Sequence, residues 1–282
     1  MRSINAQQSN KTKEQLINGK SDSRSSLIYW KWCKPQTHHH MLFLKNAFII
    51  LVSVIIYISC DDYKKAHLDL EASYKINVSE PSGLAVNSSG TELFTVSDKT
   101  STVYKLSTTG DIIQTFDFKG SNLEGISTYR ENELLLAEES KKEIVILNTL
   151  TGKSSKHKIK YKNNDRNSGI EGVTYDPNSK NIFIINEKKP GKLIRLRNDF
   201  SVIEKYSLKF AADYSGIFYE NASNQLWILS DQSKTVNKCT LSGEVIDSYR
   251  IKVAQPEGIA VTDKHIYMVC DTNARLYVYK KP

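Results

Sequence analysis

The chain has 282 residues and a formal net charge of +8, and its apolar residues are distributed unevenly along it. Its lysines are scattered rather than gathered on one basic helix, which argues against a nucleic-acid-binding protein and favours solvated strand faces and blunted sheet edges. The four cysteines show no CxxC or Cys/His spacing, which argues against a zinc site.

Residues 1–40 are polar, mixed in charge and without hydrophobic periodicity. Such a segment does not fit in front of an export signal, because a signal normally opens the chain. Two interpretations stay open. Either the start codon is overcalled and Met41 is the true initiator, or residues 1–40 form a disordered leader.

Residues 41–59 form a dense run of Ile, Leu, Val and Phe with one early lysine, and Cys60 follows it directly. This arrangement is typical of a bacterial lipoprotein signal, in which the cysteine after the apolar run carries the lipid. The sequence therefore predicts lipidation of Cys60, a tether over 60–67 and a location in the bacterial cell envelope. The alternative is an uncleaved transmembrane anchor. Both interpretations place the rest of the chain outside the cytoplasm.

From residue 68 onward the chain is rich in Val, Ile, Tyr, Thr and Ser, broken by turn-forming residues, as expected for many short strands. A motif that reaches a glycine and runs into an apolar strand recurs five times. The copies are PSGLAV at 81–86, LEGIS at 123–127, IEGVTY at 170–175, YSGIFY at 214–219 and PEGIAV at 256–261. Their glycines lie 42 to 47 residues apart, which is the period of one four-stranded blade. The sequence predicts an all-β, five-bladed β-propeller over 68–282.

Each repeat continues with a second apolar strand that ends on an acidic residue, and then with a third strand. The five strand-end acids are Asp98, Glu139, Glu187, Asp231 and Asp271. The fifth repeat has no room for a fourth strand after Tyr279. However, SYKINVSEPSGLAV at 73–86 closely matches SYRIKVAQPEGIAV at 248–261. The segment 68–78 is therefore expected to supply the outer strand of the fifth blade and close the ring, because an open ring would expose unpaired strand edges.

The motifs SEPSGLAV, LEGIS, IEGVTY and QPEGIAV, together with the acidic strand ends, resemble the SdiA-regulated family of bacterial envelope proteins. The resemblance covers about residues 68–281. It implies a five-bladed propeller, distantly similar to NHL repeats, and a calcium-binding site on the ring. The family name records a regulator of expression and implies no reaction.

The residues just before the repeat glycines are Ser82, Glu124, Glu171, Ser215 and Glu257. Equivalent residues of successive blades meet at the ring axis, where three glutamates would repel each other unless protonated or neutralised by a cation. Ca²⁺ suits such a site because it accepts six to eight oxygen ligands. Glu124, Glu171 and Glu257 are the predicted ligands, and Ser82 and Ser215 are possible additional ones.

The strand-end acids are the secondary metal candidates. Because adjacent strands run antiparallel, they lie at the same end of the ring as the predicted ligands and should make that face acidic. Their alternative role is to cap the following turns by accepting hydrogen bonds. Cys239 and Cys270 occupy different points of the repeat, so both are expected to be free, buried thiols rather than a disulfide.

No GxSxG motif is present, and each of His67, His157 and His265 is expected at the surface, so no catalytic residue is predicted. The favoured function is a non-catalytic, calcium-binding interaction module, anchored to the membrane by lipid. Its partner would be a protein, a glycan or a small ligand on the acidic face. The alternative is a metal-dependent hydrolase similar to lactonase-like or phytase-like propellers, with an ion at the channel mouth.

Overall fold

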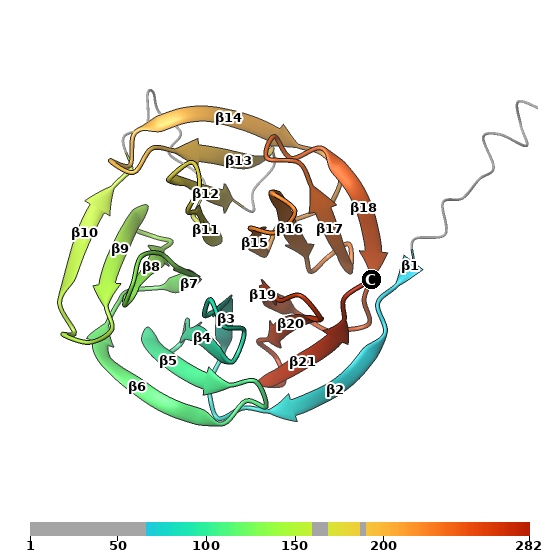
Figure 1. Ribbon diagram of the computed structural model, residues 1–282, viewed down its shortest axis with the longest axis horizontal. Coiled ribbons are helices and arrows are strands. Elements are labelled where there is room, and N and C mark those ends of the chain that lie inside the picture. Colours follow the sequence, from blue (N-terminus) through green and yellow to red (C-terminus); the bar gives the residue numbers. More distant parts are fainter. Residues whose placement is uncertain (1–65, 160–168, 187–189) are drawn as a thin grey trace, which may run out of the picture. The chain divides into compact units, whose positions relative to one another are not determined.

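A computed structural model describes residues 66–159, 169–186 and 190–282 of the chain. The elements in these ranges are all strands, grouped into five sheets around a central axis (Figure 1). The prediction of an all-β, five-bladed propeller is confirmed. The expected signal segment at 41–59, its lipidation site Cys60 and the strand-end acid Glu187 lie outside the described residues.

The first three blades each contain four consecutive antiparallel strands, given from the axis outward. The first blade consists of β3 (Pro81–Val86), β4 (Glu92–Ser97), β5 (Thr102–Ser107) and β6 (Ile112–Lys119). The second consists of β7 (Leu123–Thr128), β8 (Glu133–Glu138), β9 (Glu143–Asn148) and β10 (Ser154–Lys158). The third consists of β11 (Gly172–Asp176), β12 (Asn181–Asn186), β13 (Gly191–Leu196) and β14 (Val202–Leu208).

The last two blades use strands from both ends of the described domain. The fourth consists of β15 (Gly216–Glu220), β16 (Gln225–Ser230), β17 (Thr235–Cys239) and β18 (Val245–Arg250), with β1 (Ala66–His67) outside them. The fifth consists of β19 (Pro256–Val261), β20 (His265–Cys270), β21 (Arg275–Lys280) and β2 (Leu70–Lys75).

Burial of the strands decreases from the axis to the rim, because the inner strands are covered by neighbouring blades on both faces. Five of the six residues of β4, β8, β12, β16 and β20 are buried, whereas most residues of β6 are exposed. The core lies between adjacent blades. Trp227 and Leu229 of the fourth blade, for example, pack in one cluster with Ile259 and Met268 of the fifth.

Ring closure by the N-terminal segment is confirmed. Strand β2 pairs antiparallel with β21, with Tyr74 opposite Leu276, and the two lie side by side at the rim in Figure 1. The Arg275 guanidinium donates hydrogen bonds to the carbonyl and hydroxyl oxygens of Ser73, at 3.0 and 2.8 Å. Ile76 and Val78, which follow β2, are each 2% exposed in the core.

The beginning of the domain differs from the sequence expectation. Residues Ala66 and His67, expected in the tether, form β1, which pairs parallel with β18 (Figure 1). Leu68 anchors this segment: it is buried against the fourth and fifth blades, and its backbone N–H donates to the Arg250 carbonyl at 3.2 Å. The N-terminal segment therefore contacts two blades, whereas the repeat pattern indicated only one.

Candidate functional site

The inner strands approach each other so closely at the repeat glycines that their backbones are in contact. A Cβ atom on Gly258 would lie 2.5 Å from the Gly83 carbonyl carbon, and one on Gly125 would lie 2.9 Å from the Gly172 Cα atom. Any larger residue would push the blades apart. The channel narrows here to a cavity of about 10 Å³ that these glycines line, so the channel has two separate mouths.

The structure brings the predicted ligand residues to one mouth of the channel, directly beside this constriction. Ser82 and Ser215 are buried, and Glu124, Glu171 and Glu257 are half-buried. The two serines join neighbouring blades. The Ser215 hydroxyl donates to the Pro256 carbonyl at 2.7 Å, and the Ser82 hydroxyl donates to the Glu124 carboxylate. Both hydroxyls therefore already take part in contacts between blades.

Glu124 and the strand-end acid Asp98 share a hydrogen bond between their carboxyl groups. Burial and then the Asp98 charge raise the pKa of Glu124 to about 8, while the hydrogen bond from Ser82 opposes this rise. Burial also raises the pKa of Asp98, although its hydrogen bond with Glu124 lowers it. Glu124 is thus the member of the pair that holds the proton at neutral pH.

Glu257 lies in the field of acids from several blades. Burial raises its pKa most, and together with the charges of neighbouring acids it brings the pKa to about 8; these acids are Asp231, Glu124, Asp271 and Asp213. Asp271 in turn has a raised pKa because of burial and then the charges of Glu80 and Asp98. This mouth therefore carries an acidic cluster in which two glutamates retain protons near neutral pH. The prediction that the acids converge on one face holds for these residues.

The strand-end acids follow their strands immediately and are half-buried, as Asp98, Glu139, Asp231 and Asp271 show. Serines make capping hydrogen bonds in two of the turns. Ser97 Oγ accepts from the Thr100 N–H at 3.1 Å, and Ser230 Oγ accepts from the Ser233 N–H at 3.1 Å. Asp231 pairs with Lys234, and Asn122 donates to Glu139. Sequence reasoning missed Asp213, a buried acid that accepts a hydrogen bond from the Ser230 hydroxyl.

The chemistry of the donor set fits a hard cation, because the cluster offers carboxylate, hydroxyl and carbonyl oxygens. Burial, followed by the charges of neighbouring carboxylates, raises the pKa of Glu124 and Glu257 to about 8, so a cation beside them would favour their ionised form. As the side chains are placed, no group of three His, Cys, Asp or Glu within the described ranges is positioned to hold a metal ion. Binding of an ion would therefore require the glutamate side chains to turn toward each other.

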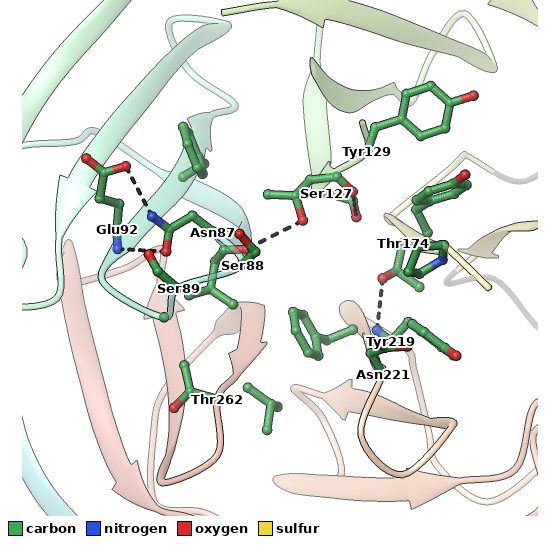
Figure 2. Close-up of a pocket in the computed structure, with 18 of the residues that line it drawn as sticks. Asn87, Ser88, Ser89, Glu92, Ser127, Tyr129, Thr174, Tyr219, Asn221 and Thr262 are labelled. Carbon is green, nitrogen blue, oxygen red and sulfur yellow. Dashed lines mark hydrogen bonds between the residues drawn. The ribbon is translucent and has the colours of Figure 1, made fainter. Parts of the chain in front are cut away.

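The opposite mouth of the channel opens into a pocket of about 1030 Å³ that the sequence reasoning did not identify. Its walls come from the ends of the inner strands and the loops that follow them, including Asn87, Ser127, Thr174, Asn221 and Thr262 (Figure 2). No single residue type occurs at these positions in all five blades. The feature of the sequence that could have indicated this pocket is the position of its residues in the repeat, at or just after the end of each apolar inner strand.

The free cysteines agree with expectation: Cys239 and Cys270 are both buried and unbonded. Burial raises the pKa of the Cys239 thiol to about 12, which makes this thiol unreactive at neutral pH. Trp227 is 1% exposed and belongs to the core. His67 is exposed, whereas His157 stacks on Phe200 and His265 pairs with Glu71.

Solved structures with a similar arrangement include selenomethionine-substituted virginiamycin B lyase from Staphylococcus aureus, at 18% identity and a TM-score of 0.47, covering 74% of this chain and 69% of that one. A streptogramin B lyase matches at 16% identity and a TM-score of 0.47, covering 75% and 72%. At these values the likeness carries no inference about activity.

No helix able to cross a membrane occurs in the described residues. The model of the SdiA-regulated family matches residues 58–280, which include every blade, and the chain belongs to this family.

Proposed function

We propose that this protein is a non-catalytic interaction module of the bacterial cell envelope, anchored by lipid on Cys60 and stabilised by Ca²⁺ at the acidic mouth of its channel. The observation that carries the calcium proposal is that Glu124 and Glu257 lie half-buried in one cluster of carboxylates, where burial and then the neighbouring charges raise the pKa of both to about 8. Near neutral pH each carboxyl either retains a proton or requires a cation beside it. Glu124, Glu171 and Glu257 would hold the ion, with Ser82 and Ser215 nearby.

A role in holding the ring together follows from where these residues lie. Glu124, Glu171 and Glu257 belong to the second, third and fifth blades, and Ser82 and Ser215 belong to the first and fourth. An ion bound among them would join blades that are otherwise connected at the axis by packing and a few hydrogen bonds. The predicted alternative, a metal-dependent hydrolase, would need in addition an open coordination position and a nearby base.

Removal of calcium should lower the melting temperature of the purified protein. At a free Ca²⁺ concentration about 100 times the dissociation constant, binding contributes about 2.7 kcal/mol. For a domain of this size that contribution corresponds to roughly 5–10 °C. Substitution of Glu124, Glu171 and Glu257 by Gln should remove both calcium binding in titration calorimetry and the effect of a chelator. The matched control is Asp69→Asn, Asp117→Asn and Glu244→Gln, which removes three exposed carboxylates elsewhere.

The stability of the calcium-free protein should depend on pH. Because the folded pKa of Glu124 and Glu257 is raised from 4.5 to about 8, the folded state binds more protons than the unfolded state between these values. The chelated protein should therefore lose stability as the pH rises from about 4.5 to about 8. The stabilisation by calcium should be larger at pH 8 than at pH 5. Unchanged calcium affinity in the triple Gln variant would instead place the site elsewhere, with the strand-end acids as the next candidates.

The envelope anchor is tested at Cys60. Replacement of Cys60 by Ala should abolish labelling by a radioactive or clickable fatty acid and release the protein from the membrane fraction, because the thiol is the attachment point of the lipid. Replacement of Cys239 by Ala serves as the control, since this buried thiol should not be acylated. Labelling that persists in the Cys60 variant would show that residues 41–59 have been misinterpreted.

A further inference from the structure

The pocket at the mouth opposite the acidic cluster is open to solvent and receives residues from all five blades. Its floor is formed by the ends of the inner strands, represented by Val86, Thr128, Thr174, Phe218 and Val261. Behind this floor the channel narrows at the repeat glycines to the cavity of about 10 Å³. A ligand in the pocket is thus separated from the acidic cluster by packed backbone.

The polar groups that face this pocket are mainly neutral hydroxyls and amides. Figure 2 shows Asn87, Ser88, Ser127, Thr174 and Thr262 arranged around the opening. Thr174 is held in place because its hydroxyl oxygen accepts a hydrogen bond from the Tyr219 N–H at 2.8 Å. Such groups can both donate and accept, so they suit a ligand that carries several hydroxyl groups.

Most of the charged side chains in the wall lie in ion pairs, and Glu131 adds one exposed carboxylate. Lys105 pairs with Glu92 at 3.2 Å, and the Arg130 guanidinium lies 3.9 Å from the Glu133 carboxylate. Glu220 is a third case, because it pairs with Lys281 and Lys238. At the rim, Asp263 and Lys264 are adjacent and of opposite sign. A charged ligand would have to disrupt these pairs, whereas a neutral one would leave them intact.

Aromatic rings lie beside the hydroxyl groups. Tyr129 and Tyr175 form an edge-to-face pair with ring centroids 4.6 Å apart, and the Arg130 guanidinium covers the Tyr129 ring at 4.4 Å. Tyr175 and Phe218 are only half-buried, although both line the pocket. A ring with one accessible face can pack against the C–H face of a sugar while neighbouring hydroxyls bind its edges. Aromatic walls with a few placed polar groups are typical of ligand sites.

We propose that this pocket binds a short neutral saccharide. The volume of about 1030 Å³ lies just above the roughly 300–1,000 Å³ that is usual for ligand pockets, which suits an oligosaccharide better than a single small sugar. The inference names a ligand class for the proposed interaction module and depends on that function. It places the ligand at the opposite mouth from the acidic cluster, so saccharide binding and calcium binding can fail separately.

The test measures binding of the purified full-length protein to an array of neutral and acidic glycans. Hits are confirmed by titration calorimetry, with cellobiose, maltose, lactose and N,N′-diacetylchitobiose as soluble probes. At least one neutral saccharide should bind. Ser88→Trp should weaken its affinity at least tenfold, because the indole would fill the opening while the exposed Ser88 takes no part in the core. Ser154→Trp, an exposed position on the outer strand β10, is the matched control and should bind normally.

A second variant and a measurement of melting temperatures distinguish a loss of binding from a loss of the folded structure. Tyr175→Ala should also weaken binding, and both Trp variants should melt within about 2 °C of the wild type, as is usual for surface substitutions in a domain of this size. No neutral glycan bound above background, binding confined to acidic glycans, or an affinity unchanged by both Ser88→Trp and Tyr175→Ala would each overturn the proposal. The triple Gln variant of the acidic mouth should still bind the saccharide, which separates this test from that of calcium.

Discussion

A truncated protein that begins at Ser79 is expected to lose its folded monomeric state. It lacks β1 and β2, so the backbone groups of β21 that face β2 in the intact domain have no partners. In the intact domain the Ile76 N–H donates to the Ala274 carbonyl and the Lys280 N–H donates to the Asp69 carbonyl, both at 2.9 Å. An exposed strand edge of this kind promotes aggregation. The fourth blade loses the edge cover that β1 provides.

The truncation also removes three core side chains. Leu68 is 8% exposed, and Ile76 and Val78 are 2% exposed. Full burial of such side chains contributes about 1.5–3 kcal/mol each, or roughly 5–9 kcal/mol together. This loss approaches the whole stability of a typical domain, about 5–15 kcal/mol. Size-exclusion chromatography should therefore show aggregates, and the cooperative thermal transition should disappear.

A circular permutant provides the matched control. Strand β21 ends beside the start of β2, with Tyr279 opposite Leu70, so a flexible linker can join Pro282 to Ala66. A permutant that starts at Ser79 and ends at Val78 keeps every strand in its place and should fold as a monomer. A truncated protein that remained monomeric with an unchanged melting temperature would show that the ring does not need this segment.

Replacement of Glu220 by Ala should cause a large loss of stability, because it leaves the buried partners of this carboxylate unpaired. The carboxylate is buried and accepts hydrogen bonds from the Lys281 ammonium, the Ser223 hydroxyl at 2.5 Å and the Trp227 indole N–H at 3.0 Å. Lys238 lies 3.8 Å away. Removal of one partner from a buried ion pair costs about 3–5 kcal/mol, which corresponds to roughly 6–20 °C in melting temperature.

The stabilisation by Glu220 depends on pH in the opposite direction to the effect of Glu124 and Glu257 on stability. Burial alone would raise the pKa of Glu220, but hydrogen bonds from Lys281, Ser223 and Trp227 bring it below its usual value of 4.5. The stabilisation is therefore present above pH 4.5 and is lost as the pH falls through the lower folded pKa. The difference in melting temperature between the wild type and Glu220→Gln should shrink below pH 4.5.

Glu204→Ala is the control for Glu220. Glu204 pairs with Arg195 at 3.2 Å, but its side chain is 50% exposed. An exposed pair contributes about 0–1 kcal/mol, so this substitution should change the melting temperature by only a few degrees. An equal effect of the Glu204 and Glu220 substitutions would contradict the argument from burial.

The sequence alone determined the number of blades, their order and the way the ring closes. Glycine is required where neighbouring inner strands come closest, as at Gly258, where an added Cβ would meet the Gly83 backbone at 2.5 Å. The sequence also predicted how the ring closes. Strand β2 occupies in the fifth blade the position that β18 occupies in the fourth, and equivalent positions in the repeat require similar residues. The antiparallel order of strands also predicted that Asp98 and Glu124 share one end of the ring.

The tertiary structure alone decided which side chains meet. Lys281 reaches Glu220, 61 residues away, and Glu124 forms a hydrogen bond with Asp98 of the preceding blade. β1 joins the fourth blade, and the loops after all five inner strands enclose one pocket. Repeats encode the pattern of strands within a blade, because backbone pairing and alternation are local. Contacts across the ring depend on the radius, tilt and stagger of the blades, which arise only when all five pack together.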